Sequence, residues 1–466
     1  MADKKSPARE FLEAKKNGFD RISDKDRGEM YKFADAYRVY IDRSKTERET
    51  VDTSIELAKA HGFVEYKRGM KLAAGDKVYV NNRGKALMLA TIGKRSPAEG
   101  VRIAGAHVDC PRLDLKTSPL YEDTEIAYFK THYYGGIKKF YWLNMPLELH
   151  GVVAKKDGTV VKVAFGADPS EPVLVISDIL IHLSGEQMKK PLAEAIPGEN
   201  LNVILGTEPA QDDDGSDRVK LAVMNILHEK YGIVEADLHS AELSLVPAMN
   251  SRDVGFDRSL IGAYGHDDRV CGYDALRALL DLSGAPEQTS VVLLCDKEEV
   301  GSTGVSGMHS ACFDTFMEDI CDSFGVPLRV CYENSVCLSN DVAAAYDPTW
   351  SGPFERHNSA FLNYGMGITK YTGSRGKSGA SDAAAELVAR VRAILDDADV
   401  VWQMAPLGAV DAGGGGTIAG IMANRNIDTI DSGVPVLGMH SPWEIISKLD
   451  LYMTYKGIKA FFESTK

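Results

Sequence analysis

The chain has 466 residues, of which 44% are hydrophobic and 26% charged, and its formal net charge is -14. This composition is typical of a globular protein, and the length favours two domains over a single core. The acidic charge balance argues against nucleic acid or an anionic membrane as the main partner, since both require a basic surface.

The N-terminal residues are charged and contain no apolar run, so no signal peptide is predicted. No stretch approaches the roughly 18 apolar residues of a membrane span. The seven cysteines form no CxxC pair. They predict reduced thiols in a cytoplasmic protein and argue against a four-cysteine zinc site.

The order of predicted elements indicates an interrupted α/β domain. Helical periodicity covers residues 7–65, and strand-like runs follow at 77–82, 86–93 and 100–109. From about 118 to 248 the pattern is β-rich, with a hairpin at Asp157-Gly158 and a further strand before residue 249. Helices are then predicted at 267–282, 381–397 and 441–464, with strands at 290–296 and 400–404. We therefore predict one discontinuous domain (1–117 and 249–466) with a β-rich insertion (118–248).

Two adjacent glutamates stand where a buried strand stops. Glu298 and Glu299 follow the run SVVLLC and precede Gly301 and Gly304. Adjacent side chains on a strand point to opposite faces, so a solvated pair would be ordinary within a strand. At the carboxyl end of a buried strand, however, both can turn into the crevice where open α/β sheets bind ligands.

Four other stretches place metal-binding groups at strand ends or helix starts. An isolated histidine at a strand end is more often structural than a ligand, but together these groups suit two divalent ions held by imidazole and oxygen. The candidates are His107 and Asp109, then His266, Asp267 and Asp268, then Asp341, then His440. Asp109 lies two residues after His107, so it is placed to accept the second ring N–H of that histidine.

A glycine run, Gly413 to Gly416, precedes Thr417. It lacks the lysine of a nucleotide-binding P-loop. The simpler interpretation is a backbone that passes close to a ligand or another chain.

The strings GAHVDCPRLDLK, DKEEVGSTG, LSNDVAAAYDP and GMHSPWE occur in this order and spacing. Together they resemble the aspartyl aminopeptidase family, M18, of metallo-aminopeptidases of the bacterial type, over nearly the whole chain. The resemblance implies a zinc-peptidase-like α/β/α sandwich with a mixed sheet, plus an inserted β-rich dimerisation domain.

The resemblance also implies a site with two divalent ions per subunit, with zinc expected first and manganese or cobalt as alternatives. Asp267 is then the bridging ligand, His107 and Asp341 complete one site, and Glu299 and His440 complete the other. Glu298 is the general base, which takes a proton from water and returns it to the leaving amine. Adjacent glutamates thus receive different roles.

The sequence departs from the family pattern at two places. The bridging aspartate stands in the context HDDR, so Asp267 and Asp268 both remain candidates, with Asp267 preferred. Histidines that often follow the family's SxD aspartate are replaced here by VAAAYDP after Asp341. The second departure affects the expected substrate pocket and leaves the ligand Asp341 in place.

Two outer residues match family positions. His182 matches a histidine that reaches a neighbouring subunit's active site, although by sequence alone it reads as a buried histidine. Lys370 matches a substrate-binding position, although a solvated loop lysine is the default. The family implies dimers assembled into a tetrahedral dodecamer, which act on peptides. Broad N-terminal specificity is expected, with acidic residues possible.

Other functions remain open from the residues. One is a deblocking-aminopeptidase-like or deacylase-type amidohydrolase with the same metals. Another is a catalytically silent assembly or cargo-binding protein, whose signature would be loss of the base or of a ligand. Neither is lost in this sequence.

Overall fold

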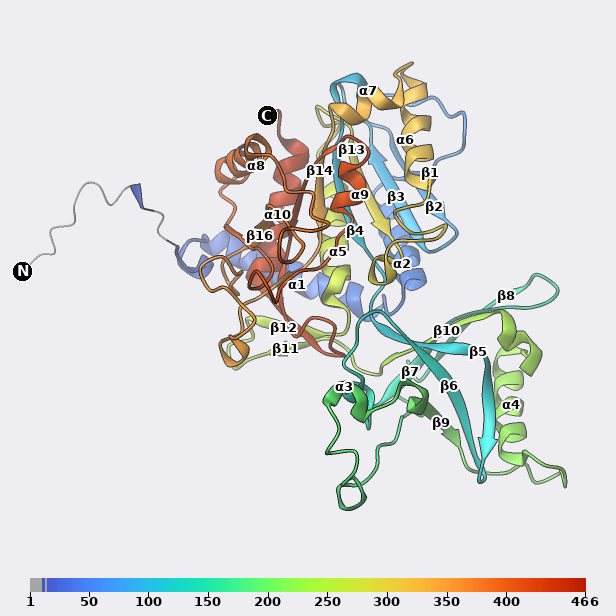
Figure 1. Ribbon diagram of the computed structural model, residues 1–466. Helices are drawn as coiled ribbons and strands as arrows, with labels where there is room; N and C mark the ends of the chain where they lie inside the picture. Colours follow the sequence, from blue (N-terminus) through green and yellow to red (C-terminus); the bar gives the residue numbers. More distant parts are fainter. Residues whose placement is uncertain (1–10, 13–14) are drawn as a thin grey trace, which may run out of the picture.

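The computed structural model describes residues 11–12 and 15–466. The helical pattern expected for residues 7–10 and 13–14 falls outside these described ranges. The described residues form three sheets, and the largest of these lies in the body at the top of Figure 1. Among the described helices, none is long and apolar enough to cross a bilayer.

The main sheet has nine strands in the order β1-β2-β3-β13-β4-β14-β18-β16-β17. Its centre is parallel, since β4 pairs in parallel with both β13 and β14, while β3 and β16 add antiparallel neighbours. The strands are β1 (Val64–Glu65), β2 (Lys77–Asn82), β3 (Ala86–Thr91), β4 (Arg102–His107), β13 (Ser290–Cys295), β14 (Val336–Asn340), β16 (Met366–Thr369), β17 (Trp402–Met404) and β18 (Asp428–Gly433).

Helices cover both faces of this sheet. Two separate apolar cores lie between the sheet and these helices, one on each face of the sheet. The central strands are apolar along their whole length because both of their faces are buried. One layer contains α1 (Asp24–Asp42), α2 (Glu47–Ala60), α5 (His266–Leu280), α8 (Ala385–Asp397) and α10 (Lys448–Glu463); the other contains α6 (Cys312–Ser323), α7 (Leu328–Glu333) and α9 (Ala419–Ala423). The predicted α/β/α sandwich with a mixed sheet is confirmed.

A six-stranded antiparallel sheet lies below the main body in Figure 1, with its own apolar core. Its order is β8-β7-β10-β5-β6-β9, and α4 packs against it. The elements are β5 (Arg112–Asp123), β6 (Ile126–Tyr134), β7 (Leu147–Ala154), β8 (Val160–Phe165), α3 (Leu192–Ala195), β9 (Asn202–Gly206), α4 (Arg218–Tyr231) and β10 (Ala241–Pro247). The hairpin expected at Asp157-Gly158 joins β7 to β8.

The third sheet corrects the prediction of a helix from residue 441. It has the order β11-β12-β20-β19-β15 and comprises β11 (Arg252–Val254), β12 (Leu260–Ala263), β15 (Ala343–Ala344), β19 (Pro435–Leu437) and β20 (Glu444–Ser447). Residues 444–447 form β20 because Ile446 pairs with Ile261 of β12 and fills the core. The helix starts only at Lys448, where the Ser447 hydroxyl caps it.

Ion pairs join the six-stranded sheet to the N-terminal part of the main body. Arg112 of β5 donates to Glu47 of α2 over 3.0 Å, and His150 of β7 lies 2.7 Å from Glu49 of the same helix. These groups are largely buried. The end of β6 also lies close to the carboxyl end of β4, because the Tyr134 hydroxyl contacts the Asp109 carboxylate.

Candidate metal centre

Five sequence-predicted ligands come together at the carboxyl ends of the parallel strands. His107 ends β4, Asp341 follows β14, and Asp267 lies in the first turn of α5. Glu299 is in the short 3-10 helix η8 (Glu298–Val300) that follows β13, and His440 follows β19. Chain segments far apart in sequence thus meet at one edge of the main sheet, as expected for a ligand site in an open α/β sheet.

One group of donors contains His107, Asp267 and Asp341. Nε2 of His107 lies 3.2 Å from Oδ1 of Asp267 and 3.8 Å from Oδ1 of Asp341. The three donor atoms lie within 4.8 Å of one another. Imidazole and carboxylate oxygen at this spacing suit a divalent ion such as zinc.

The second group contains Asp267, Glu299 and His440. Nε2 of His440 lies 3.1 Å from Oδ2 of Asp267 and 3.5 Å from Oε1 of Glu299. Asp267 therefore directs one carboxylate oxygen to each group. In the described part of the chain, these are the two groups of His, Cys, Asp and Glu side chains with metal-binding spacing.

The electrostatics of the cluster fit divalent cations. Burial, followed by the Asp267 charge, raises the pKa of Glu299 to about 9, and burial also raises the pKa of Asp341 well above its usual value. Oε1 of Glu299 is buried without a hydrogen-bond partner. A buried, unpaired carboxylate is costly, so the cluster has an excess of negative charge that bound cations would neutralise.

Asp109 supports this cluster, but its carboxylate makes different contacts from the one that the sequence predicts. Nδ1 of His107 contacts the backbone oxygen of Asp109 at 3.0 Å, whereas the Asp109 carboxylate is 3.4 Å away. The carboxylate instead accepts the backbone N–H groups of Glu298 and Glu299, at 3.0 and 3.2 Å. β4 ends at His107, so the same-face spacing of a strand no longer applies at Asp109.

Glu298 faces the cluster and belongs to neither group of donors. Its Oε2 lies 4.0 Å from Nε2 of His107, and its side chain is 16% exposed. Burial raises the pKa of Glu298 above its ordinary value; the Asp109 and Asp267 charges act in the same direction, and His107 opposes them. A carboxylate with a raised pKa is suited to proton transfer near neutral pH.

Glu444 is a supporting residue that the sequence reasoning missed. It is buried at the start of β20, where Oε1 accepts the backbone N–H of His440 at 2.7 Å and Oε2 accepts that of Asp267 at 2.9 Å. One carboxylate thereby fixes the backbone of two predicted ligands. Its only sequence signal is an acid four residues after His440.

The end of β6, from the six-stranded sheet, also contacts the cluster. The Tyr134 hydroxyl donates to Oδ2 of Asp109 at 2.8 Å, and the ring covers the Arg112 guanidinium at 4.1 Å. Two residues later, the Gly136 carbonyl lies 2.9 Å from Nδ1 of His440. This strand end thus supports the glutamate pair through Asp109 and orients one predicted ligand directly.

We expect Tyr134→Phe to lower kcat about tenfold while KM and metal content stay within twofold of wild type. The ring over Arg112 remains, and only the hydrogen bond to the buried Asp109 charge is lost, at a cost of about 1.5–3 kcal/mol. Steady-state kinetics and metal analysis measure this. Tyr133→Phe, at the exposed neighbouring residue, is the control and should match wild type. An unchanged kcat for Tyr134→Phe would rule out the positioning role.

The remaining candidates lie outside the cluster. Both Asp268 carboxylate oxygens are buried without partners, and the residue joins neither donor group. Lys370 is paired with Asp382. His182 is exposed in the 3-10 helix η5 (Ile181–Leu183), beyond β8 in the six-stranded-sheet region. The roles of Lys370 and His182 stay predictions.

A cavity of about 430 Å³ adjoins the cluster and is lined by both histidines and by Glu298. Gly414 to Gly416 form part of its wall, so the backbone of the glycine run does pass close to the site. Five further wall residues are apolar, namely Val342, Ala343, Ala405, Leu407 and Met439, and the polar ones are Thr369, Thr372, Thr417 and Asp431. This cavity has the room and the reactive groups to receive a substrate.

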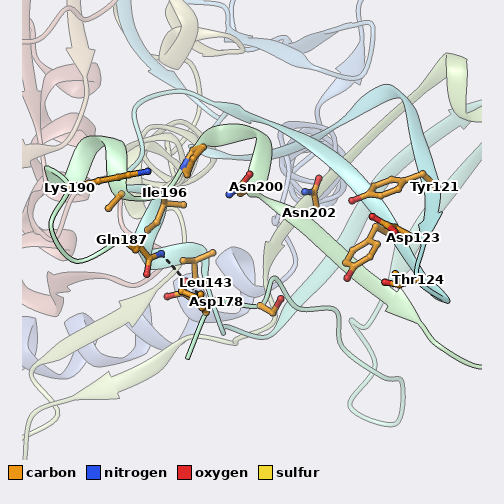
Figure 2. Close-up of a pocket in the computed structure, with 15 residues that line it drawn as sticks. Tyr121, Asp123, Thr124, Leu143, Asp178, Gln187, Lys190, Ile196, Asn200 and Asn202 are labelled. Carbon is orange, nitrogen blue, oxygen red and sulfur yellow. Dashed lines mark hydrogen bonds between the residues drawn. The ribbon is translucent and has the colours of Figure 1, made fainter. Parts of the chain in front are cut away.

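A second cavity, of about 510 Å³, lies between β5, β6 and the segment that precedes β9 (Figure 2). Tyr121 and Asp123 line one end, and Gln187 donates to Asp178 at 3.1 Å at the other. No histidine and none of the predicted ligands line it. Although it is the larger of the two, it contains neither the predicted metal ligands nor Glu298.

Residues 40–462 match the family model for the aminopeptidase I zinc metalloprotease, M18. The probable M18 family aminopeptidase 1 of Clostridium acetobutylicum is 47% identical, over 98% of this chain and 99% of that protein. A crystal structure of an M18 family aminopeptidase from Thermotoga maritima has a TM-score of 0.92 at 43% identity, covering 97% of this chain and 100% of the other. The structure of aminopeptidase I from Clostridium acetobutylicum has a TM-score of 0.90 at 45% identity, over 97% and 100%.

Proposed function

The chain belongs to the M18 family of zinc metallo-aminopeptidases, and on that premise we propose that it removes N-terminal residues from peptides with two divalent ions and Glu298 as general base. His107, Asp267 and Asp341 would hold one ion, and Asp267, Glu299 and His440 the other. Zinc is the expected metal, because the donors are imidazole and carboxylate groups.

One observation carries this proposal: the two carboxylate oxygens of Asp267 face two different histidines, at 3.2 and 3.1 Å. A single shared carboxylate between two separate sets of donors is the arrangement required of a bridging ligand. Divalent ions at such a site polarise a carbonyl group and lower the pKa of water.

The chain's own groups carry the proton transfers. Glu298 takes a proton from the attacking water as the new C–O bond forms, and it delivers that proton to the leaving nitrogen as the peptide bond breaks. Asp109 fixes the backbone of Glu298 through one hydrogen bond and that of Glu299 through another. The apolar cavity walls exclude water from the side of the site that receives the substrate.

Chelation of the protein and re-addition of metal provide the first test. We expect a chelator to abolish hydrolysis of aminoacyl chromogens and added zinc, manganese or cobalt to restore it. Substrates with a free α-amine should be cleaved, whereas N-acetylated ones should not. Cleavage of the acetylated substrates would favour the deacylase-type alternative. An enzyme fully active after complete removal of metal would contradict the proposal.

We also propose that the chain forms a closed homo-oligomer through the inserted sheet region. Residues 179–192 carry a group of exposed apolar side chains around His182: Ile179, Leu180, Ile181, Leu183, Met188 and Leu192. Exposed apolar side chains of this number mark a protein–protein contact. A second copy of the chain is the expected partner, and dimers assembled into a tetrahedral dodecamer are the form implied by the family resemblance.

Mixed oligomers test whether His182 serves a neighbouring active site. Alone, His182→Ala and Glu298→Gln should each be nearly inactive, because each chain would lack one required group at its site. Co-assembly of the two variants should restore part of the activity. In a mixed pair, the His182→Ala chain keeps its own Glu298 and receives an intact His182 from the neighbouring Glu298→Gln chain. An active monomer in light scattering would remove this role.

A further inference from the structure

A third cavity, of about 320 Å³, borders the cavity beside the metal cluster at Leu407, which lines both. It is lined mainly by the loop that follows β16 and the loop that follows β17, and none of the predicted ligands lines it. The glycine run extends from one cavity to the other, since Gly413 lines the third cavity and Gly414 lines the cavity at the cluster. The volume of the third cavity falls in the range of ligand pockets, about 300–1,000 Å³.

Backbone hydrogen bonds join the two loops beside these cavities. The N–H of Gly373 donates to the carbonyl oxygen of Gly415 at 3.2 Å, and the N–H of Arg375 donates to that of Val410 at 2.7 Å. Arg375 and Val410 both line the third cavity. The backbone that carries Arg375 is therefore tied directly to the opposite wall.

Positive side chains line the third cavity, whereas the cavity at the cluster has none. Arg375 and Lys377 belong to the third cavity, but among the described residues that line the cavity at the cluster none is a lysine or arginine. Lys377 is paired with Asp382 at 2.9 Å. In the described part of the chain, the Arg375 guanidinium takes part in no ion pair. Arg375 is thus available to pair with a ligand.

One acid, Glu355, also lines the third cavity. Its Oε1 accepts the backbone N–H of His357 at 2.9 Å, and its Oε2 accepts that of Asn358 at 3.1 Å. Both oxygens are therefore engaged within their own turn, whereas the Arg375 donors are free. A carboxylate that enters the cavity gains charge-assisted hydrogen bonds from Arg375. The other walls are mainly aromatic or apolar, with Tyr371, Pro406, Leu407, Ala409 and Val410.

We infer that the third cavity binds a carboxylate of the peptide downstream of the cleaved bond, with Arg375 as the specificity-determining residue. The inference rests on the proposed aminopeptidase function and adds a second subsite to it. When the first peptide bond lies at Glu298, the following residues extend away from the metal cluster by about 3.3–3.6 Å each. The carboxylate belongs to an acidic side chain or to the C-terminus of a short peptide, because a guanidinium group binds both in the same bidentate way.

Peptides that begin with leucine test the inference on the metal-loaded wild-type enzyme. Two series of tetrapeptide amides carry glutamate, glutamine or lysine at the second or at the third position, and a third series compares a leucyl dipeptide with a free C-terminal carboxylate with its amide. In at least one series, we expect kcat/KM for the carboxylate peptide to exceed that of its amide counterpart about threefold to tenfold at low salt. This advantage should shrink at about 1 M salt, because Arg375 is exposed.

The three series also separate the sources of the carboxylate, since each presents it at one place in the peptide. A ratio near one in all three, or faster cleavage of the lysine peptides, would overturn the inference while leaving the aminopeptidase function intact. Failure to cleave any of the peptides would overturn both.

Arg375→Gln assigns the preference to its source. The substitution keeps a polar side chain and removes the charge, so the ratio of carboxylate to amide peptides should fall to about one. Arg356→Gln is the matched control, at an exposed arginine that does not line the cavity, and should keep the wild-type ratio. A ratio that survives in a folded Arg375→Gln enzyme would overturn the role of Arg375. The wild-type ratio remains decisive if that variant does not fold.

Discussion

Replacing Glu298 by glutamine is expected to lower kcat about 100- to 10,000-fold, the contribution typical of a positioned acid–base group. The amide has nearly the same shape but cannot accept the proton. KM should change little, and both ions should remain, because Glu298 belongs to neither donor group. Steady-state kinetics together with metal analysis of the same preparation measure this.

Glu298→Asp is a useful companion variant. It keeps the carboxylate but shortens its reach, so its kcat should fall between that of wild type and that of Glu298→Gln. A Glu298→Gln enzyme with near-normal kcat would show that another group moves the proton. Loss of metal from Glu298→Gln would instead identify Glu298 as a ligand.

Replacing Asp267 by asparagine is expected to have the second large effect. Both predicted sites share this carboxylate, so the bound metal should fall to less than one ion per chain. The value of kcat/KM should fall by at least about 1,000-fold. The expected loss of kcat/KM is this large because several kcal/mol of charge stabilisation in the transition state are lost, and each 1.36 kcal/mol changes the rate by a factor of about ten. Metal titration and kinetics measure it.

Asp268→Asn is the matched variant and resolves the alternative left open by the sequence HDDR. Asp268 is fully buried, and burial raises its pKa well above the usual value. Asp268→Asn should therefore keep both ions and most activity. Retained metal in Asp267→Asn, with loss in Asp268→Asn, would transfer the bridging role to Asp268.

Much of the fold could be predicted from local patterns. The apolar runs at β3, β4 and β13 are unbroken, as strands buried on both faces require. The helix predicted from residue 441 is wrong at residues 444–447, because the sequence from Trp443 onward runs into α10 without a glycine or proline. Only the pairing of β20 with β12, far apart in the chain, decides that this segment is a strand.

The candidate ligands were predictable because strand ends and helix starts can be located from the sequence, and parallel strands bring those ends together. Their supporting residues were not. Tyr134 acts across the contact between the six-stranded sheet and the main body, and Glu444 acts where β20 approaches the first turn of α5. These contacts depend on tertiary packing, which no local pattern in one sequence encodes.

Anomalous diffraction at the zinc edge, from crystals of the zinc-loaded enzyme, tests the two-ion site most directly. The account predicts two peaks per chain, one between His107, Asp267 and Asp341 and the other between Asp267, Glu299 and His440. It also predicts no peak at Asp268 or Glu298. A single peak, or two peaks that do not share Asp267, would contradict the proposed site.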